Sequence, residues 1–429
     1  MTGTDRSQAI EPAGRRAGIA GRREKTPVYS SLKVEPRAVL RRLWILFLYG
    51  SGLLWWAKRR LAARGGVVVL TFHRVLPDGD FEKTNSPRGM VMRERTFARL
   101  ARHLAQECEL VDLAGGEPDW SRNGGRLRVA LTFDDGWADN AGSAFPIARE
   151  SGLPWTIFIC PERAGRAFPF WPERVVALWR AAARCGVTAE IIAMFDAAGE
   201  SGFGGSPLPD RAPSPEMLIE RLKLFPADLR EAAFERMSEI VASVEGDDLY
   251  ASAVIDSLMT WDDMEGLASC GVTFGSHTLS HVILTRVLER QAQREIANSK
   301  WVIERKLRRP CRLFANPNSD WSYAVREMVA QAGYELAFAG GPGVWERDTD
   351  PLLIPRVNLW EGSVTCRSGA FSRIALEYTT FWKAYRAAKA PARRAQEPRF
   401  ASSGSRRGRS VPMATDHSVR RREEGESLR

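Results

Sequence analysis

The sequence has few cysteines, and none of them belongs to a short paired motif. Its 429 residues include six cysteines that stand singly, without a CxxC pair. Single cysteines inside apolar runs such as Thr156–Cys160 are typical of small buried side chains in a reducing compartment. The pattern therefore argues against a disulfide framework and a cysteine-ligated metal, and it favours a cytoplasmic location.

The sequence also lacks an apolar run of bilayer-spanning length. Its longest uncharged apolar run, residues 43–57, has 15 residues, whereas a spanning helix needs about 20. A cleaved signal peptide fits poorly, because the run starts far from the N-terminus and lacks a small-residue cleavage site. Basic flanks and three tryptophans favour a shallow anchor through residues 43–60, on the inner face of the membrane. A buried helix packed on the domain is the alternative.

Excess positive charge is absent from the middle of the chain. The formal net charge of +10 is carried by the ends, because residues 1–64 are net +10 and residues 383–429 are net +8. Residues 65–382 are therefore net −8. A nucleic-acid-binding domain would carry its basic residues on the folded surface, so we expect no nucleic-acid partner. Nothing in the sequence predicts an oligomeric state.

From Gly65 onward, strand-length apolar runs alternate with helical patterns, which predicts parallel strands joined by crossover helices. We expect an α/β fold that closes as a barrel or forms an open sheet. Expected strands are Val67–Phe72, Leu127–Phe133, Trp155–Cys160, Val272–Gly275, Cys311–Ala315 and Leu336–Ala339. Polar side chains follow several of these strands, at the end where α/β barrels place their active sites.

The expected organisation has three parts. Residues 1–64 form a basic N-terminal segment containing the short hydrophobic stretch 43–57. Residues 65–382 form the α/β domain, interrupted at about 163–258 by helical patterns that we interpret as an insertion. Residues 383–429 are rich in arginine, serine, alanine and glycine, and we expect this basic tail to be disordered.

Two motifs carry candidate chemistry. The first is Asp134-Asp135-Gly136 after a strand, where adjacent side chains point in different directions. Taken alone, such a tripeptide is often a turn. The second contains His277 and His281, two of only five histidines, spaced to hold one ion on a helical face. A chance surface pair is the alternative for these histidines.

Together the motifs supply two histidines, one aspartate as a third ligand, and a spare aspartate. Three protein ligands with an open position are typical of a catalytic metal site. The metal lowers the pKa of a bound water to about 7, and the spare carboxylate can accept that water's proton. Hydrolysis of an amide or ester is the reaction that this set favours.

The same motifs, in the same order, resemble those of the polysaccharide deacetylase family, the NodB homology domain of carbohydrate esterase family 4. Further stretches agree, at residues 70–75, 314–318 and 331–340, so the resemblance covers roughly residues 65–362. It implies a distorted (β/α) barrel of the NodB type, with a helical insertion and basic disordered ends, that removes acetyl groups from N-acetylated sugars. It also implies Asp134 as the catalytic base, and Asp135, His277 and His281 as ligands of a divalent metal, zinc before cobalt or nickel.

The chain departs from the family pattern at two positions. The family's motif arginine would fall at Ala315, so Arg356 is our candidate replacement from a neighbouring strand. The family's late catalytic histidine is missing, because none lies between His281 and His417. His73 is the candidate general acid, with a strand-end structural role as the alternative. The backbone N–H of Asn318 is the candidate oxyanion donor, which does not depend on side-chain identity.

Aromatic residues near the insertion are candidates for a sugar-stacking platform. They are Phe168, Phe170, Trp171 and, farther along the chain, Trp261. Core packing is the alternative for each of them. The sequence thus predicts a carbohydrate N-deacetylase acting on a hexosamine-containing glycan. A degenerate glycan-binding relative and a metal-dependent amidohydrolase acting on a non-sugar amide remain open.

Overall fold

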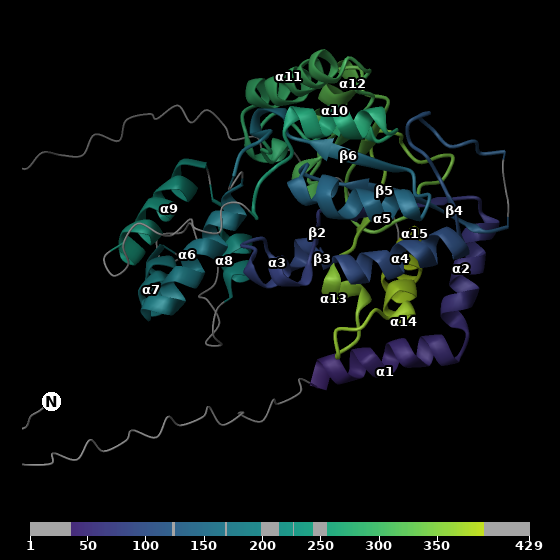
Figure 1. Ribbon diagram of the computed structural model, residues 1–429, viewed down its shortest axis with the longest axis horizontal. Coiled ribbons are helices and arrows are strands. Elements are labelled where there is room, and N and C mark those ends of the chain that lie inside the picture. Colours follow the sequence, from purple (N-terminus) through teal and green to yellow (C-terminus); the bar gives the residue numbers. More distant parts are fainter. Residues whose placement is uncertain are drawn as a thin grey trace, which may run out of the picture. The chain divides into compact units, whose positions relative to one another are not determined.

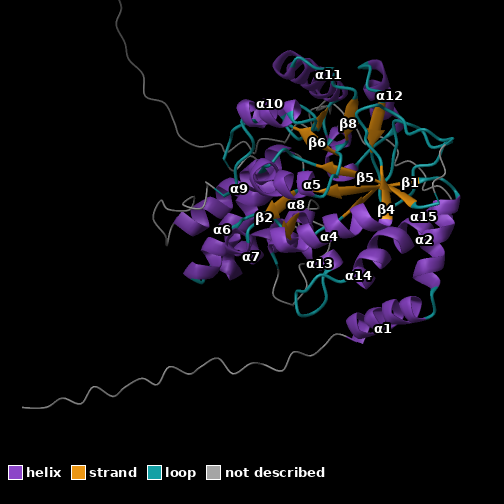
Figure 2. Cartoon of the chain, turned by 45° about the vertical axis from the view of Figure 1, so that its right-hand side comes forward, coloured by secondary structure: helices purple, strands orange, loops and turns teal. Residues whose placement is uncertain are grey.

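The computed structural model describes residues 36–121, 125–167, 170–198, 214–225, 227–242 and 255–389. The predicted disordered ends lie for the most part outside these ranges. The chain divides into two units, Met1–Trp44 and Ile45–Arg429. Of the first unit, only the beginning of helix α1 (Pro36–Gly50) is described. The second unit contains every strand of the described residues and the candidate site (Figures 1 and 2).

The second unit is built on a parallel sheet in the order β10-β1-β5-β6-β7-β8-β9, with β4 also pairing with β5. These strands are β1 (Val67–Phe72), β4 (Cys108–Leu110), β5 (Leu127–Phe133), β6 (Trp155–Ile159), β7 (Thr273–Ser276), β8 (Leu313–Ala315), β9 (Leu336–Phe338) and β10 (Arg356–Asn358). β1 and β5 are buried along their whole length, as expected for parallel strands covered on both faces. A separate pair joins β2 (Arg74–Leu76) and β3 (Val91–Arg93).

The sheet curls until its two edges nearly meet. Ile354, just before β10, forms a parallel bridge with Phe338 of β9. The Ile354 amide donates to the Ala337 carbonyl at 2.9 Å, and the Ala339 amide donates to the Ile354 carbonyl at 3.0 Å. The α/β fold and the distorted (β/α) barrel are therefore confirmed.

Helices surround the strands (Figure 2). The helices of the barrel unit are α2 (Leu53–Ala63), α3 (Asp78–Lys83), α4 (Glu94–Glu107), α5 (Phe145–Glu150), α10 (Trp261–Ser269), α11 (Glu289–Leu307), α12 (Tyr323–Gln331), α13 (Glu361–Val364), α14 (Arg373–Glu377) and α15 (Lys383–Lys389). α15 lies inside the segment that the sequence predicted as a tail, because Ala384 and Tyr385 are buried in the main core.

Between β6 and β7 the described residues form four α-helices, which Figure 1 shows beside the barrel. They are α6 (Trp171–Cys185), α7 (Thr188–Ala198), α8 (Pro215–Leu222) and α9 (Ala227–Ala242). Their apolar faces form a hydrophobic cluster of their own, centred on fully buried residues such as Leu218 and Phe234. The insertion is thus a helical bundle with its own core.

The hydrophobic stretch at residues 43–57 does not form one helix. Gly52, with φ 76°, separates α1 from α2, and this left-handed conformation is easily adopted only by glycine. Leu54, Ala57 and Leu61 of α2 are buried, whereas Trp55 remains 59% exposed. Among the described helices, none combines the length and apolar character that crossing a bilayer requires.

Candidate metal and catalytic site

The predicted site residues gather where the barrel strands end. His73 follows β1, Asp134 and Asp135 follow β5, and His277 follows β7. With His281, these side chains line one cavity of about 630 Å³. The carboxyl ends of parallel strands meet at one face of a barrel, which explains why motifs far apart in the sequence converge here.

Asp135, His277 and His281 form a cluster suited to a metal ion. The His281 Nε2 atom lies 3.3 Å from Asp135 Oδ1, and His277 Nε2 lies 3.6 Å from the same oxygen. One ligand atom from each residue falls within 4.8 Å of the others. Asp135 Oδ1 is buried and has no hydrogen-bond donor. An orphaned carboxylate oxygen facing two imidazole nitrogens fits a divalent ion such as zinc.

Neighbouring groups orient two of these three side chains. The Trp137 indole donates to Asp135 Oδ2 at 3.0 Å, which leaves Oδ1 facing the histidines. His277 Nδ1 donates to the Ala315 carbonyl at 2.8 Å, which leaves the Nε2 lone pair free to bind a metal. Burial lowers the pKa of His277 to about 4, so this imidazole is neutral at pH 7, as a metal ligand must be.

Asp134 is held by Arg356 in a buried, two-pronged ion pair. The two guanidinium nitrogens lie 2.7 and 2.8 Å from the two carboxylate oxygens. Burial would raise the pKa of Asp134, but the opposing charges of Arg356 and the two nearby imidazoles outweigh it and lower the pKa. The carboxylate is therefore ionised at neutral pH. The structure brings Arg356 to the position that the sequence analysis proposed for it.

His73 lies beside this pair. Its Nε2 atom is 4.0 Å from Asp134 Oδ2, and its buried Nδ1 atom has no hydrogen-bond partner. A side chain held only by protein hydrogen bonds would not leave that nitrogen unused. The alternative of a fully satisfied strand-end histidine therefore fits poorly, although its role as general acid stays a prediction.

Backbone strain is concentrated around this cavity. Six described non-glycine residues have positive φ, and five of them lie at the site: Asp135, Thr278, His281, Asn318 and Ser319. Such conformations are costly for residues with a side chain and persist where the surroundings enforce them, often at functional sites. Asn318 lines the cavity wall, and its proposed part in holding an oxyanion stays a prediction.

The helical insertion forms one wall of the cavity, through Phe170, Trp171 and Glu173 with several residues of α8. The Phe170 ring lies 4.5 Å from the His281 ring, centroid to centroid. Phe168 lies outside the described residues. Trp261 does not line this cavity; it packs against the main core at the start of α10, with Lys306 over its ring. The core alternative is the correct one for Trp261.

Sequence reasoning missed several members of the site. Trp360, two residues after β10 and directly before α13, lines the cavity and was not predicted. Glu173 was also missed: it is fully buried, and its Oε1 accepts from the Ser86 hydroxyl at 3.1 Å. Burial, with a smaller effect of the Asp135 charge, raises its pKa to about 8. Trp137, which donates to Asp135, was missed as well. Its position two residues after Asp135 was the one sequence feature that could have indicated this contact.

Comparison with known proteins gives a match to the polysaccharide deacetylase family model over residues 240–337. A Bacillus subtilis (strain 168) protein with the provisional name polysaccharide deacetylase YxkH is 24% identical over 113 residues. That alignment covers 26% of this chain and 40% of the relative, so the chain matches less than half of that protein's length.

Two solved structures are also similar. The Streptococcus pyogenes deacetylase PplD in complex with acetate has a TM-score of 0.45 and 13% identity, over 73% of this chain and 98% of that one. IcaB from Ammonifex degensii has a TM-score of 0.42 and 19% identity, over 70% and 93%. Likenesses this distant assign no activity. The family match contains His277 and His281, and it bears out, for residues 240–337, the resemblance drawn from the sequence.

Proposed function

We propose that this chain is a metal-dependent hydrolase that removes N-acetyl groups from a hexosamine-containing poly- or oligosaccharide. One observation carries the proposal: the Asp134–Arg356 pair and the Asp135–His277–His281 cluster line the same cavity. An ionised carboxylate next to a three-ligand cluster with an open position is the arrangement that metal-assisted hydrolysis requires.

A divalent ion at Asp135, His277 and His281, most simply zinc, would supply a bound water with a pKa near 7. Asp134 accepts the proton of the attacking water, and Arg356 keeps this carboxylate ionised and oriented. His73, whose Nε2 atom lies 4.0 Å from Asp134 Oδ2, donates a proton to the departing amine in this proposal. The products are acetate and a free amino sugar.

The cavity suits a sugar substrate more than a compact amide. Trp171 and Trp360 both line it, and flat apolar rings provide stacking surfaces. Glu216, Glu220 and Lys223 add hydrogen-bonding groups along α8 and just beyond it. A cavity of about 630 Å³ with these walls has room for more than the acetamido group alone.

Acetate release from N-acetylglucosamine oligomers, measured after loading with zinc, cobalt or nickel, tests the proposal. We expect metal-dependent release that Asp134→Asn lowers by about 10²–10⁴-fold while metal content stays unchanged. Asp320→Asn, a substitution outside the cavity lining, serves as the matched control. Metal binding without acetate release from any glycan would favour a non-sugar amide, and a protein that binds no metal would favour a degenerate glycan-binding relative.

A further inference from the structure

Exposed apolar side chains are concentrated at the start of the barrel unit. Of the twelve large hydrophobic residues that are exposed in the described chain, five lie between residues 46 and 56: Leu46, Phe47, Tyr49, Trp55 and Trp56. We call these five residues the α1–α2 surface. Three more, Leu40, Leu43 and Trp44, lie earlier on α1. A soluble surface rarely collects so many apolar residues unless they contact a partner or a membrane.

The opposite face of α2 fixes this surface to the barrel. Leu54, Ala57 and Leu61 are at most 1% exposed, and Ala57 and Leu61 belong to the main hydrophobic core. Helix α2 therefore already uses its core-facing side. Trp55 remains 59% exposed, and burying its ring against the same domain would require α2 to rotate and expose its packed face. Trp56, 38% exposed, packs edge-on against Tyr385 at 5.3 Å between ring centroids and leaves the rest of its ring in solvent.

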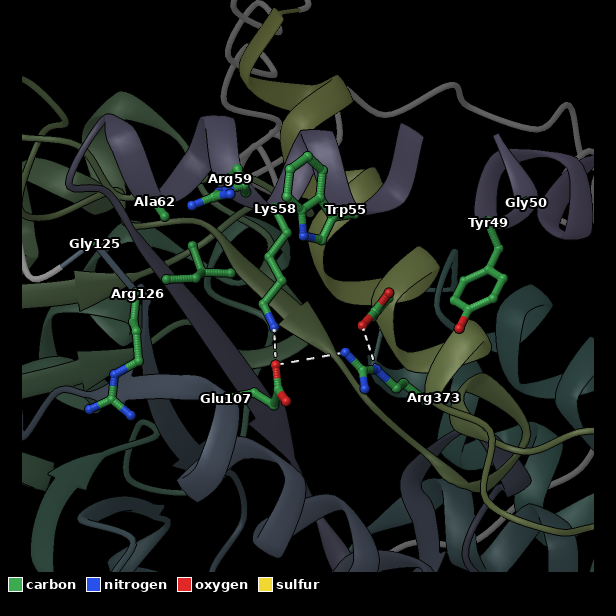
Figure 3. Close-up of a pocket in the computed structure, with 12 residues that line it drawn as sticks. Tyr49, Gly50, Trp55, Lys58, Arg59, Ala62, Glu107, Gly125, Arg126 and Arg373 are labelled. Carbon is green, nitrogen blue, oxygen red and sulfur yellow. Dashed lines mark hydrogen bonds and ion pairs between the residues drawn. The ribbon is translucent and has the colours of Figure 1, made fainter. Parts of the chain in front are cut away.

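A basic pocket of about 550 Å³ adjoins this surface. Figure 3 shows its residues, which include Tyr49 and Trp55 of the α1–α2 surface. Four basic side chains and two carboxylates line it: Lys58, Arg59, Arg126, Arg373, Glu107 and Glu377.

Two of the four basic side chains are already committed to carboxylates. Lys58 contacts Glu107 at 3.1 Å, and Arg373 contacts Glu107 at 3.7 Å and Glu377 at 2.8 Å. Within the described ranges, neither Arg59 nor Arg126 forms an ion pair. Arg59 instead lies over the Trp55 ring, 4.8 Å from its centroid. The pocket thus offers uncompensated positive charge next to exposed aromatic rings.

We propose that the α1–α2 surface docks onto an anionic phospholipid bilayer, with Arg59 and Arg126 binding lipid phosphates. Tryptophan and tyrosine favour the bilayer interface, where the ring is buried among lipids and the polar edge stays in water. Guanidinium groups bind phosphate oxygens through paired hydrogen bonds. Because none of the described helices can span a bilayer, the contact is interfacial.

Co-sedimentation of the full chain with vesicles tests this inference. Phosphatidylcholine vesicles with and without phosphatidylglycerol are compared, and we expect stronger binding to the anionic ones, weakened by salt. Trp55→Ser combined with Arg59→Gln should lower binding at least about fivefold, because each basic residue near an anionic surface contributes about 1 kcal/mol. Arg126→Gln alone should lower binding to anionic vesicles only.

The chain offers a matched control pair. Trp301 on α11 is also 59% exposed, and Arg305 lies over its ring at 5.1 Å. Trp301→Ser combined with Arg305→Gln should bind vesicles like the unaltered protein. Thermal melting shows whether each variant folds.

Four results would overturn the proposal. One is equal or absent binding to both vesicle types, and another is equal loss in the two double variants. The third is competition by free glycerol phosphate, which would indicate a soluble anion site. Light scattering without vesicles must give a monomer, because a dimer lost in Trp55→Ser/Arg59→Gln would assign the surface to a second copy of the chain.

Discussion

At the scale of single residues, the Asp134–Arg356 pair shows how one contact sets the working range of a catalytic base. The guanidinium stabilises the ionised carboxylate, so the base is available well below neutral pH. Without the second guanidinium contact, the pKa of Asp134 moves upward, because burial is then less well opposed.

Arg356→Lys should therefore shift the acid limb of the pH–rate profile to higher pH and lower acetate release at neutral pH by about tenfold or more. The readout is kcat/KM for a soluble oligomer across pH. Arg326 forms a similar two-pronged pair with Asp350, at 3.0 and 3.2 Å, away from the cavity. Arg326→Lys is the control, and an unshifted profile in Arg356→Lys would contradict the assignment.

The pKa of Glu173 is shifted in the opposite direction from that of Asp134, and this shift affects the stability of the fold. Its pKa in the folded protein is raised to about 8 from an ordinary 4.5, so the folded state holds a proton that the unfolded state releases. Between these two values, stability falls as pH rises. Glu173→Gln removes this dependence, and the variant should gain stability relative to the unaltered protein between pH 5 and pH 8. Urea unfolding with a chelator present measures the gain; exposed Glu231→Gln should show none.

At the scale of elements, the insertion combines a separate core with a wall of the cavity. Phe234 is fully buried within the insertion's cluster, and its ring lies 6.2 Å from that of Trp171. Phe97, by contrast, contacts Phe72 and Phe133 in the barrel core. Loss of either phenylalanine leaves a cavity, but in different parts of the molecule.

Phe234→Ala should cost about 3–5 kcal/mol locally and raise amide exchange in α6–α9 more than in β1 and β5. We also expect a higher KM for oligomers, because the wall that carries Trp171 loosens. Phe97→Ala should instead raise exchange in the barrel strands. Hydrogen exchange by mass spectrometry separates the two patterns, and uniform loosening by Phe234→Ala would rule out an independent core.

How far the sequence predicts the strands depends on their length and on whether they lie within an apolar run. β1 and β5 are long apolar runs with clear ends, and their predicted bounds are those of the structure. β2, β3, β4 and β10 have three residues each and were not predicted, whereas β8 and β9 are equally short but lie inside the predicted apolar runs Cys311–Ala315 and Leu336–Ala339. Arg356 was therefore found through a motif and its missing arginine, and not through a predicted strand.

The same limit applies to the site. Residues in motifs could be placed together because parallel strands end at one face, whereas Glu173 and Trp360 reach the cavity through helix and loop packing that no local pattern encodes. Trp261 packs against the main core, the alternative that the sequence analysis left open, because a position at a helix start does not by itself show which way an aromatic ring faces.

At the scale of the whole molecule, metal binding should couple to stability, because the cluster joins the ends of β5 and β7. At a zinc concentration a hundred times the Kd, the folded state gains about 2.7 kcal/mol. Thermal unfolding with zinc and then with a chelator measures this gain. His281→Ala should abolish it, whereas His103→Ala, in α4, should leave it intact; a zinc effect that survives His281→Ala would place the ion elsewhere.

Strand β5 joins the two ends of the barrel. It starts at Leu127, which lines the basic pocket, and ends one residue before Asp134 in the catalytic cavity. Seven residues at about 3.3 Å each separate these points by roughly 23 Å. If the basic pocket binds lipid, the length of β5 sets the distance between the membrane surface and the catalytic cavity. The sugars next to a membrane-bound anchor then stay out of reach, and only units farther along the glycan enter the cavity.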